Sequence, residues 1–462
     1  MCFLNKKVIN LKNRRKKKQT LMMAAYVCVC IFGLSGCGRI SDFHESLPDV
    51  EEIIDNIVEE ETKEEAEETE AASSKEVSEK VPKAQEYPEI EENQVEEGTS
   101  SLSREDQEKR REEIGLSEAD IVGLQEIQFG NYYFEQLTSS ERRLYVELYR
   151  ILEIQAEEIL VSTLDAELLP RVYQCVINDH PEFFYMNGYT YTQYTRQDEI
   201  QYITFSGRYI YDADEVARRQ ERIDAVVEEK AGTLVGIDDY ETVKNVYEDL
   251  ILSTDYSMDS PDNQNICSVF LDRKSVCNGY AKAAQYLLNY LGIPCIIVNG
   301  TALGAAHAWN IVEIDGAYYH MDVTWGDPSY YAEEAEEKNG APSIDYSYLL
   351  VTTAEISRNH TISTEFRIPE CSFDRDNYFV REGIYLYGYD EGRMEEIFDA
   401  AKSQGKNTVI IKACDRQAYN EIYDNLINEQ KIFDYFGVYQ SDGEYKVAYS
   451  GNEELYTISF WE

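Results

Sequence analysis

The middle of the chain has two stretches whose apolar residues recur every three or four positions, the spacing of one helix face. They run over 239–252 and 278–291, and the Gly292 and Pro294 that follow are typical of a helix end. Shorter apolar stretches come next and predict strands at 295–298, 307–314 and 318–323. The centre of the chain is therefore predicted to combine helices with strands.

The regions on either side of this centre also alternate helical and strand patterns. Before it, the spacing predicts helices at 141–160, 170–178 and 213–235 and strands at 189–195 and 202–211. Thr138 and Ser139 are candidate N-caps for the first of these helices. After the centre, the spacing predicts a small α+β domain, with helices at 394–403 and 416–429 and strands at 408–412, 444–448 and 455–460.

The composition of the chain excludes one class of function and indicates where its segments begin and end. The net charge of −45 at pH 7 argues against nucleic-acid binding, because phosphate neutralisation requires clustered Lys and Arg. Much of the charge lies in a Glu-rich, low-complexity stretch that predicts a disordered tether, either a spacer from a membrane or solvated disorder without a further role. The predicted segments are 1–37 signal peptide, 38–115 acidic tether, 116–236 N-terminal α+β region, 237–365 core and 366–462 C-terminal α+β domain.

The first residues have the pattern of a bacterial secretory signal. A basic segment at 6–18 precedes the apolar segment 21–34, and Leu34-Ser35-Gly36-Cys37 follows. Residues 21–36 are too few for a transmembrane anchor, which takes roughly 20 residues. With Cys37 at the cut, the segment resembles a lipoprotein signal, in which Cys37 is acylated and becomes the new N-terminus. The resemblance implies a lipid-anchored protein on the extracytoplasmic face of a bacterial cell membrane.

The cysteines and acidic residues do not form a metal-binding pattern. After cleavage at Cys37 the remaining cysteines are irregularly spaced, with no C-x-x-C pair, which favours neither a zinc site nor a dense disulfide framework. Four of them are predicted to be buried small side chains: Cys175, Cys267, Cys295 and Cys371. The acidic run at 333–337 lacks the spacing of a calcium loop. We expect no metal and no organic cofactor.

The parts of a thiol acyl-transfer site follow one another in the predicted core: Cys277, His307 and Asp322. In such a site the thiol attacks, the imidazole holds its proton, and the carboxylate orients the imidazole. Taken singly, each residue has an ordinary structural explanation, as a buried cysteine, a satisfied histidine or a turn cap. The ordered combination, within the local sequences SVCNGYA, HAWN and HMDVTWGDP, favours the catalytic interpretation.

The spacing of His307 and Asp322 has a geometric consequence. The Asp-Gly pair at 315–316, between two apolar stretches, predicts a hairpin with a two-residue turn. In this register Trp309 faces Asp322, and His307 lies on the same sheet face as both. His307 and Asp322 are then diagonal neighbours, with backbones roughly 7–8 Å apart and side chains within bonding reach. His320 lies on the same face, and no role is assigned to it.

The thiol has two features that favour its ionised form. Cys277 begins a predicted helix, where unpaired N–H groups and the helix dipole favour negative charge. A neighbouring His307 would favour a thiolate–imidazolium pair. The backbone N–H of Cys277 is a candidate oxyanion-hole donor. Gln264 or Asn265 is a candidate second donor, although each is more simply explained as a loop residue.

The three local sequences resemble the transglutaminase-like (papain-related) superfamily, in its bacterial extracytoplasmic branch. The resemblance covers 241–328 and extends to 361, and it departs at Ser275, where relatives often have Gly on what we expect to be a surface turn. It implies an α+β, papain-like core in which a helix carrying Cys277 packs on an antiparallel sheet carrying His307 and Asp322. It assigns these three residues as the catalytic triad.

The resemblance implies an acyl-thioester formed at Cys277 from an amide or peptide bond. With water as the acceptor the result is proteolysis or deamidation, and with an amine it is cross-linking. The expected substrate is a protein or peptide, either a surface protein or a cell-wall peptide. Two alternatives stay open: a non-catalytic cell-surface binding or assembly module that keeps the fold, and a protein whose flanking domains carry the function.

Overall fold

The computed structural model describes residues 7–10, 90–96, 103–328, 342–439 and 445–461. The predicted lipid-anchor residue Cys37 and the acidic run at 333–337 lie outside these residues. Most of the predicted signal peptide and tether also lies outside them. Among the described residues, no helix has the length and the hydropathy that crossing a bilayer requires.

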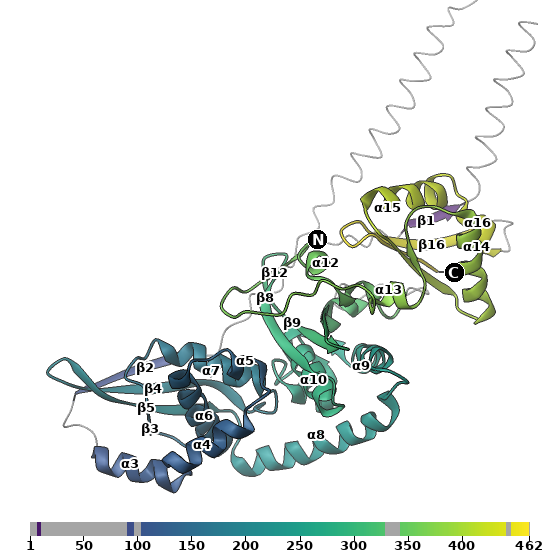
Figure 1. Cartoon of the computed structure of the whole chain (residues 1–462). Helices are drawn as coiled ribbons and strands as arrows, with labels where there is room; N and C mark the ends of the chain where they lie inside the picture. Colours follow the sequence, from purple (N-terminus) through teal and green to yellow (C-terminus); the bar gives the residue numbers. More distant parts are fainter. Residues whose placement is uncertain (1–6, 11–89, 97–102, 329–341, 440–444, 462) are drawn as a thin grey trace, which may run out of the picture. The chain divides into compact units, whose positions relative to one another are not determined.

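A five-stranded antiparallel sheet forms the centre of the fold, with the strand order β11-β10-β9-β8-β12 (Figure 1). The strands are β8 Cys295–Ala302, β9 Ala305–Ile314, β10 Ala317–Met321, β11 Leu349–Val351 and β12 His360–Ile362. α10 (Cys277–Tyr290) packs on β8 and β9, and α9 (Asp239–Ser253) packs on α10. The predicted helices and strands of this region are confirmed, and so is the α+β class.

The two faces of this sheet have different neighbours. Asn310 of β9 points to α10, since its Nδ2 donates to the carbonyl oxygen of Ala281 at 2.9 Å. Successive residues of a strand point to opposite faces, so His307 and Trp309 point to the other face. There Trp309 belongs to a buried cluster that includes Trp325. Alternation along β9 therefore places His307 among aromatic rings, on the face that α10 does not cover.

Short elements join the helices and strands of the centre. They are β6 Asp255–Tyr256, the π-helix η1 Ser268–Asp272, β7 Lys274–Ser275, α11 Val323–Gly326, the 3-10 helix η3 Tyr346–Tyr348, α12 Thr353–Ile356 and α13 Tyr378–Arg381. β7 ends two residues before Cys277, and α12 ends four residues before His360. These short elements set where the candidate site residues lie.

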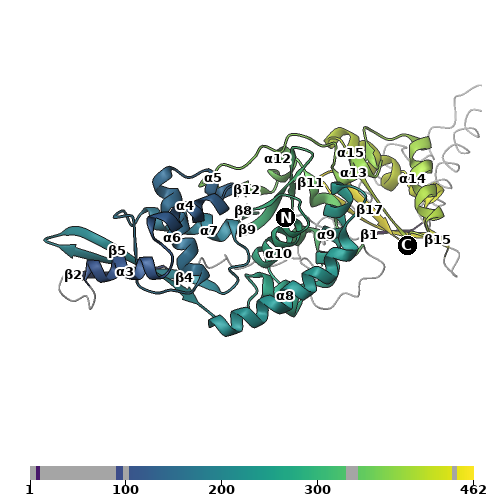
Figure 2. The ribbon, with the colours of Figure 1, turned by 60° about the horizontal axis from the view of Figure 1, so that its bottom comes forward.

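The region before the centre contains a four-stranded sheet, in the order β2-β4-β5-β3, with helices beside it (Figures 1 and 2). The strands are β2 Ile90–Glu96, β3 Ile159–Val161, β4 Met186–Arg196 and β5 Glu199–Tyr209. The helices are α3 Arg104–Glu113, α4 Glu118–Ile127, α5 Tyr132–Glu135, α6 Ser139–Glu153, α7 Leu168–Asp179 and α8 Ala213–Leu234. The two strands predicted here and the helices predicted at 170–178 and 213–235 are confirmed.

One predicted helix is too long. The helix expected over 141–160 begins after its N-cap Thr138, as predicted, but ends at Glu153. Gln155 and Glu158 then take positive φ angles of 54° and 55°, which stop a helix, and β3 follows and pairs with β5. Ile159 and Leu160, the last apolar residues of the expected helix, belong to this strand instead. A short apolar run does not by itself distinguish a helix from a strand.

The predicted disordered tether at 38–115 is also corrected at its C-terminal end. α3 and β2 both lie within this range, and β2 pairs in parallel with β4. Ser103 and Asp106 form a capping box at the start of α3. Arg111 donates to the fully buried Glu147 at 2.6 Å. The acidic composition of this stretch predicted disorder, but the capping box and the buried ion pair hold α3 in place.

The region after the centre contains a further sheet, in the order β1-β16-β17-β14-β13, with β15 also paired to β16. Its strands are β1 Lys7–Asn10, β13 Tyr385–Leu386, β14 Thr408–Ala413, β15 Val438–Tyr439, β16 Tyr445–Asn452 and β17 Thr457–Trp461. Its helices are α14 Glu391–Ser403, α15 Arg416–Tyr423, the π-helix η4 Asp424–Asn428 and α16 Ile432–Tyr435. The predicted α+β pattern is confirmed, and the helix expected at 416–429 is divided between α15 and η4.

Candidate active site

Cys277 is the first residue of α10, and the preceding Val276 offers no side-chain cap. The helix therefore presents its unpaired N–H groups at the thiol, as the sequence predicts. The thiol is largely buried, with 8% of Cys277 exposed. The loop before η1 lies beside it, because Asn278 Nδ2 donates to the carbonyl oxygen of Gln264 at 3.1 Å.

Ser275 does not lie on a surface turn, contrary to the expectation. It is fully buried, and its hydroxyl lies 2.7 Å from that of Ser268 and donates to the carbonyl oxygen of Asn263 at 3.2 Å. A methyl group on Gly279 would lie 2.0 Å from the Ser275 hydroxyl oxygen, so Gly279 leaves room for this side chain. Ser275 thus ties the strand before Cys277 to the loop and to η1.

The predicted hairpin register is confirmed. β9 and β10 pair with Ile314 opposite Ala317 and Asn310 opposite Met321, which sets Asp322 opposite Trp309 by continuation. The turn residues Asp315 and Gly316 have φ angles of 49° and 73°, the pair of positive angles that a type I′ turn requires.

The predicted contact between His307 and Asp322 is present. His307 Nε2 lies 2.7 Å from Asp322 Oδ2, and the backbone N–H of Trp325 donates to Oδ1 at 3.0 Å. Asp322 is fully buried and 5% of His307 is exposed. Because a carboxylate only accepts hydrogen bonds, Nε2 of His307 carries a hydrogen, and Nδ1 is left for the thiol of Cys277, which lies near enough to raise the pKa of His307.

The charges of this pair stabilise each other. Burial alone lowers the pKa of His307, but the charge of Asp322 and the bonds to Asp322 and Cys277 outweigh it and raise the pKa to about 10. Burial also raises the pKa of Asp322, yet the two neighbouring imidazoles hold it below its usual value. The imidazolium–carboxylate form of this pair is therefore favoured at neutral pH.

Aromatic rings surround the pair and keep water away from it. The rings of His307 and Trp309 stack with centroids 5.9 Å apart, and Trp325 lies 6.2 Å from His307. His320 lies on the expected face but does not bond to the triad. It accepts from Trp309 Nε1 at 3.0 Å, and burial lowers its pKa to about 3. His320 therefore orients Trp309 as a neutral acceptor.

The structure adds one residue to this site that the sequence analysis did not single out. His360 Nε2, on β12, lies 3.0 Å from the same Asp322 Oδ2 that bonds to His307. His360 is buried and stands outside the three recognised local sequences. Its one sequence signal was its rarity, since the chain has five histidines. Only the pairing of β12 with β8, opposite Ala302, places it here.

The two candidate oxyanion donors differ in their bonding. Asn265 is buried, and its Oδ1 accepts from the backbone N–H of Cys267 at 2.9 Å, so its side chain holds the local turn. Gln264 is half-buried in the same loop, beside the start of α10. Its role as an oxyanion donor stays a prediction.

A metal ion is the other partner to consider for this cluster. His307, Asp322 and His360 each offer a ligand atom, all within 4.8 Å of one another. Their contacts of 2.7 and 3.0 Å are shorter than the roughly 3.3 Å that separates ligands around a tetrahedral zinc. These distances fit direct hydrogen bonds better than metal ligation.

Among the described residues the cysteines are free thiols. Cys175, Cys267, Cys295 and Cys371 are buried, as predicted, and Cys414 is partly exposed. Burial raises the pKa of Cys295 and of Cys175, so these thiols stay protonated. Of the cysteines described, Cys277 is the one with a histidine–carboxylate pair beside it.

The part of the chain that carries this site matches a known family. The sequence pattern of the Transglutaminase-like superfamily matches residues 231–323, which include Cys277, His307 and Asp322 but not His360. A search of curated proteins finds no match.

Several solved structures match part of the chain. A transglutaminase structure is 14% identical over 33% of this chain and 54% of its own, with a TM-score of 0.22. A proposed cysteine protease from Cytophaga hutchinsonii is 14% identical over 29% and 61%, with a TM-score of 0.20. The periplasmic domain of TgpA from Pseudomonas aeruginosa is 18% identical over 28% and 58%, with a TM-score of 0.20. The chain thus spans less than two thirds of the length of each.

Proposed function

The chain contains a transglutaminase-like domain, and from this premise we propose that it is a thiol acyl-transfer enzyme with Cys277, His307 and Asp322 as its triad. The observation that carries the proposal is the hydrogen bond between His307 and Asp322, beside the thiol of Cys277. Asp322 accepts from His307 Nε2 at 2.7 Å, which leaves Nδ1 of His307 available to that thiol. This is the arrangement that nucleophilic catalysis by a thiol requires.

In the first half-reaction the Cys277 thiolate attacks the carbonyl carbon of an amide. The tetrahedral oxyanion is stabilised by backbone N–H groups at the start of α10, with Gln264 proposed as a side-chain donor. The C–N bond then breaks as His307 Nδ1 gives its proton to the leaving amine. The products are the free amine and an acyl-thioester on Cys277, with His307 neutral.

In the second half-reaction an acceptor attacks the thioester carbon. His307 takes a proton from the acceptor, the C–S bond breaks, and the thiolate–imidazolium pair is restored. Water as acceptor gives a carboxylic acid, and a primary amine gives a new amide. We propose a protein or peptide as substrate, from a surface protein or from the cell wall, because the attacked bond is an amide.

The first prediction concerns the reactivity of the thiol. Iodoacetamide alkylates the thiolate, whose sulfur displaces iodide, so the rate reports the ionised fraction of Cys277. In the full chain we expect half-maximal alkylation of Cys277 well below about pH 8.5, the usual pKa of a free cysteine. His307→Ala is expected to move this midpoint to about pH 8.5 or above. Peptide mass spectrometry separates Cys277 from the other thiols.

The partly exposed Cys414 serves as an internal control, because it lies outside the triad and His307→Ala should leave its alkylation unchanged. A Cys277 midpoint near that of a free thiol, and insensitive to His307→Ala, would contradict the proposal. That outcome would favour the non-catalytic binding module, for which a retained fold without an activated thiol suffices.

A second prediction concerns the membrane anchor, which we also propose. Cells that express the full chain and are fed an alkyne-tagged fatty acid should incorporate the tag into it, because Cys37 follows the lipoprotein-type signal. Cys37→Ser should remove the label and keep the uncleaved signal. Fluorescence after coupling a dye to the alkyne measures this, with Cys30→Ser as the matched control. Label that persists in Cys37→Ser would refute the anchor at this position.

A further inference from the structure

One oxygen of the Asp322 carboxylate accepts hydrogen bonds from two histidines. Oδ2 lies 2.7 Å from His307 Nε2 and 3.0 Å from His360 Nε2, while Oδ1 accepts from the Trp325 backbone. Asp322 and the side chain of His360 are fully buried. A buried carboxylate is held in place by its donors, and His360 supplies one of three.

His360 must donate to Asp322, because a carboxylate only accepts. Its other nitrogen, Nδ1, lies 2.6 Å from Asn359 Oδ1. Asn359 thus holds the ring in the orientation that directs Nε2 at Asp322.

The C-terminal domain holds Asn359 in turn. Glu454 lies in the turn between β16 and β17, and its Oε2 accepts from Asn359 Nδ2 at 3.3 Å. Its carbonyl oxygen accepts from Arg358 Nη1 at 2.8 Å. The next residue, Leu455, is fully buried in the same cluster as Trp309. This turn therefore packs against the cluster of Trp309 and Trp325 beside the candidate site.

We propose, on the basis of the proposed function, that His360 is a positioning residue that holds the Asp322 carboxylate against His307. The β16–β17 turn, through Glu454 and Asn359, keeps His360 in the orientation this requires. The hydrogen-bonded chain runs from Glu454 through Asn359, His360 and Asp322 to His307, beside the thiol of Cys277. It gives the C-terminal domain a part in forming the catalytic site.

Losing the His360 N–H has a definite consequence for the triad. Asp322 would keep only His307 and the Trp325 backbone as donors, and losing one of three hydrogen bonds to a buried charge carries an energetic penalty. The carboxylate relieves this penalty by rotating or by taking up a proton. Either change removes negative charge from beside His307, so less imidazolium and less thiolate form at a given pH.

The titratable groups that face Asp322 come from four elements. They are His307 on β9, His360 on β12, Cys277 on α10 through His307, and Tyr247 on α9. Burial raises the pKa of Tyr247 well above its usual value, so this phenol stays neutral. Of these, His360 is the group whose removal changes the bonding of Asp322 without touching His307 or Cys277.

The test compares three variants of the full chain by the pH dependence of Cys277 alkylation with iodoacetamide. His360→Phe keeps a ring without an N–H, and we expect the midpoint to rise by about one pH unit. His360→Gln can place an amide N–H near the position of Nε2 and should restore most of the wild-type midpoint. His180→Gln is the matched control and should keep the wild-type midpoint, since His180 is also buried but bonds to Glu182 and Gln128, outside the candidate site.

The turn is tested in the same way. Glu454→Ala should raise the midpoint by less than His360→Phe, while Glu453→Ala should leave it unchanged, because Glu453 is exposed and pairs with Arg416 at the surface. A midpoint in Glu454→Ala equal to wild type would overturn the part given to the turn.

The failure of this proposal differs from failure of the proposed function. If wild-type Cys277 is activated and His307→Ala abolishes the activation, but His360→Phe keeps the wild-type midpoint, His360 has no positioning role. The same holds if His360→Phe and His360→Gln shift the midpoint equally. If instead wild-type Cys277 reacts as an ordinary thiol, the proposed function itself fails.

Discussion

Asp322→Asn is expected to lower the free energy of unfolding at pH 6 by about 3–5 kcal/mol, the usual cost of breaking a buried ion pair. It is also expected to remove most of the pH dependence of stability between about pH 6.5 and 10. The amide matches the carboxylate in shape, but its N–H end cannot accept from His307 or His360. Both losses follow from the bonds that Asp322 accepts at 2.7 and 3.0 Å.

The sign of the pH dependence follows from the two pKa shifts. Against burial, Asp322 raises the pKa of His307 from 6.5 to about 10, so the stability contributed by this pair is complete below pH 6.5 and is lost as the pH rises to about 10. The pKa of Asp322 is lowered, so its contribution is present above pH 3.8 and is lost only in more acidic solution. Stability from the pair should thus be greatest between about pH 4 and 6.5.

The difference between the wild-type and Asp322→Asn unfolding free energies, measured by urea titration at several pH values, isolates this pair. The difference should shrink by up to about 5 kcal/mol between pH 6.5 and 10. Asp327→Asn is a matched control, because buried Asp327 accepts from the Tyr280 hydroxyl, which an amide oxygen also accepts. A wild-type curve parallel to that of Asp322→Asn over this range would contradict the assigned ion pair.

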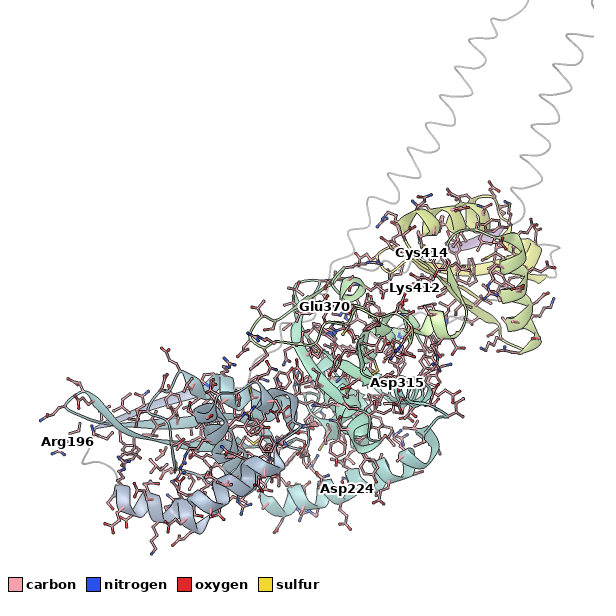
Figure 3. All side chains as sticks on the ribbon, in the orientation of Figure 1. Arg196, Asp224, Asp315, Glu370, Lys412 and Cys414 are labelled. Carbon is pink, nitrogen blue, oxygen red and sulfur yellow. The ribbon has the colours of Figure 1, made fainter. Side chains whose placement is uncertain are left out.

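Replacing Lys412 by Met is expected to cost about 3–5 kcal/mol of stability. Lys412, which is labelled in Figure 3, lies on β14, and 1% of its side chain is exposed. Its Nζ is 2.5 Å from Glu355 Oε1, and Glu355 lies on α12, just before β12 and His360. Removing the ammonium leaves the mostly buried Glu355 carboxylate without its cation. An uncompensated buried charge lowers the free energy of unfolding.

The double variant Lys412→Met with Glu355→Gln separates the ion pair from packing. A glutamine keeps the capping box that Glu355 forms with Thr352 but carries no charge, so the double variant should recover most of the lost stability. Urea unfolding of the single and double variants gives both values. A cost below about 1 kcal/mol for Lys412→Met alone would show that this pair behaves as an exposed one.

The geometry of His307 and Asp322 was predictable because it depends on local rules. An Asp-Gly pair between apolar stretches selects a two-residue turn, and strand alternation then decides which side chains share a face. The observed register and the 2.7 Å contact agree with that prediction. The N-terminal position of Cys277 on α10 was predictable for the same reason, since helix ends are marked in the local sequence.

The predictions failed where the deciding contact is distant along the chain. The end of the helix after Glu153 depends on pairing between β3 and β5. α3 lies in an acidic stretch, where a buried pair between Arg111 and Glu147 fixes it. Ser275 was expected on the surface, and its burial depends on hydroxyl contacts with Ser268 and Asn263. Composition averages over a segment and does not register such single contacts.

The amino-acid sequence by itself determined the α+β class, the helix that begins at Cys277 and the hairpin that joins His307 to Asp322. Each follows from periodicity, turn chemistry and helix-end signals within a few tens of residues. Only the tertiary structure decided that His360 shares Asp322 and that a turn of the C-terminal domain holds Asn359. These contacts join strands through sheet order and side-chain packing, which depend on the whole chain being folded and have no periodic signal in the sequence.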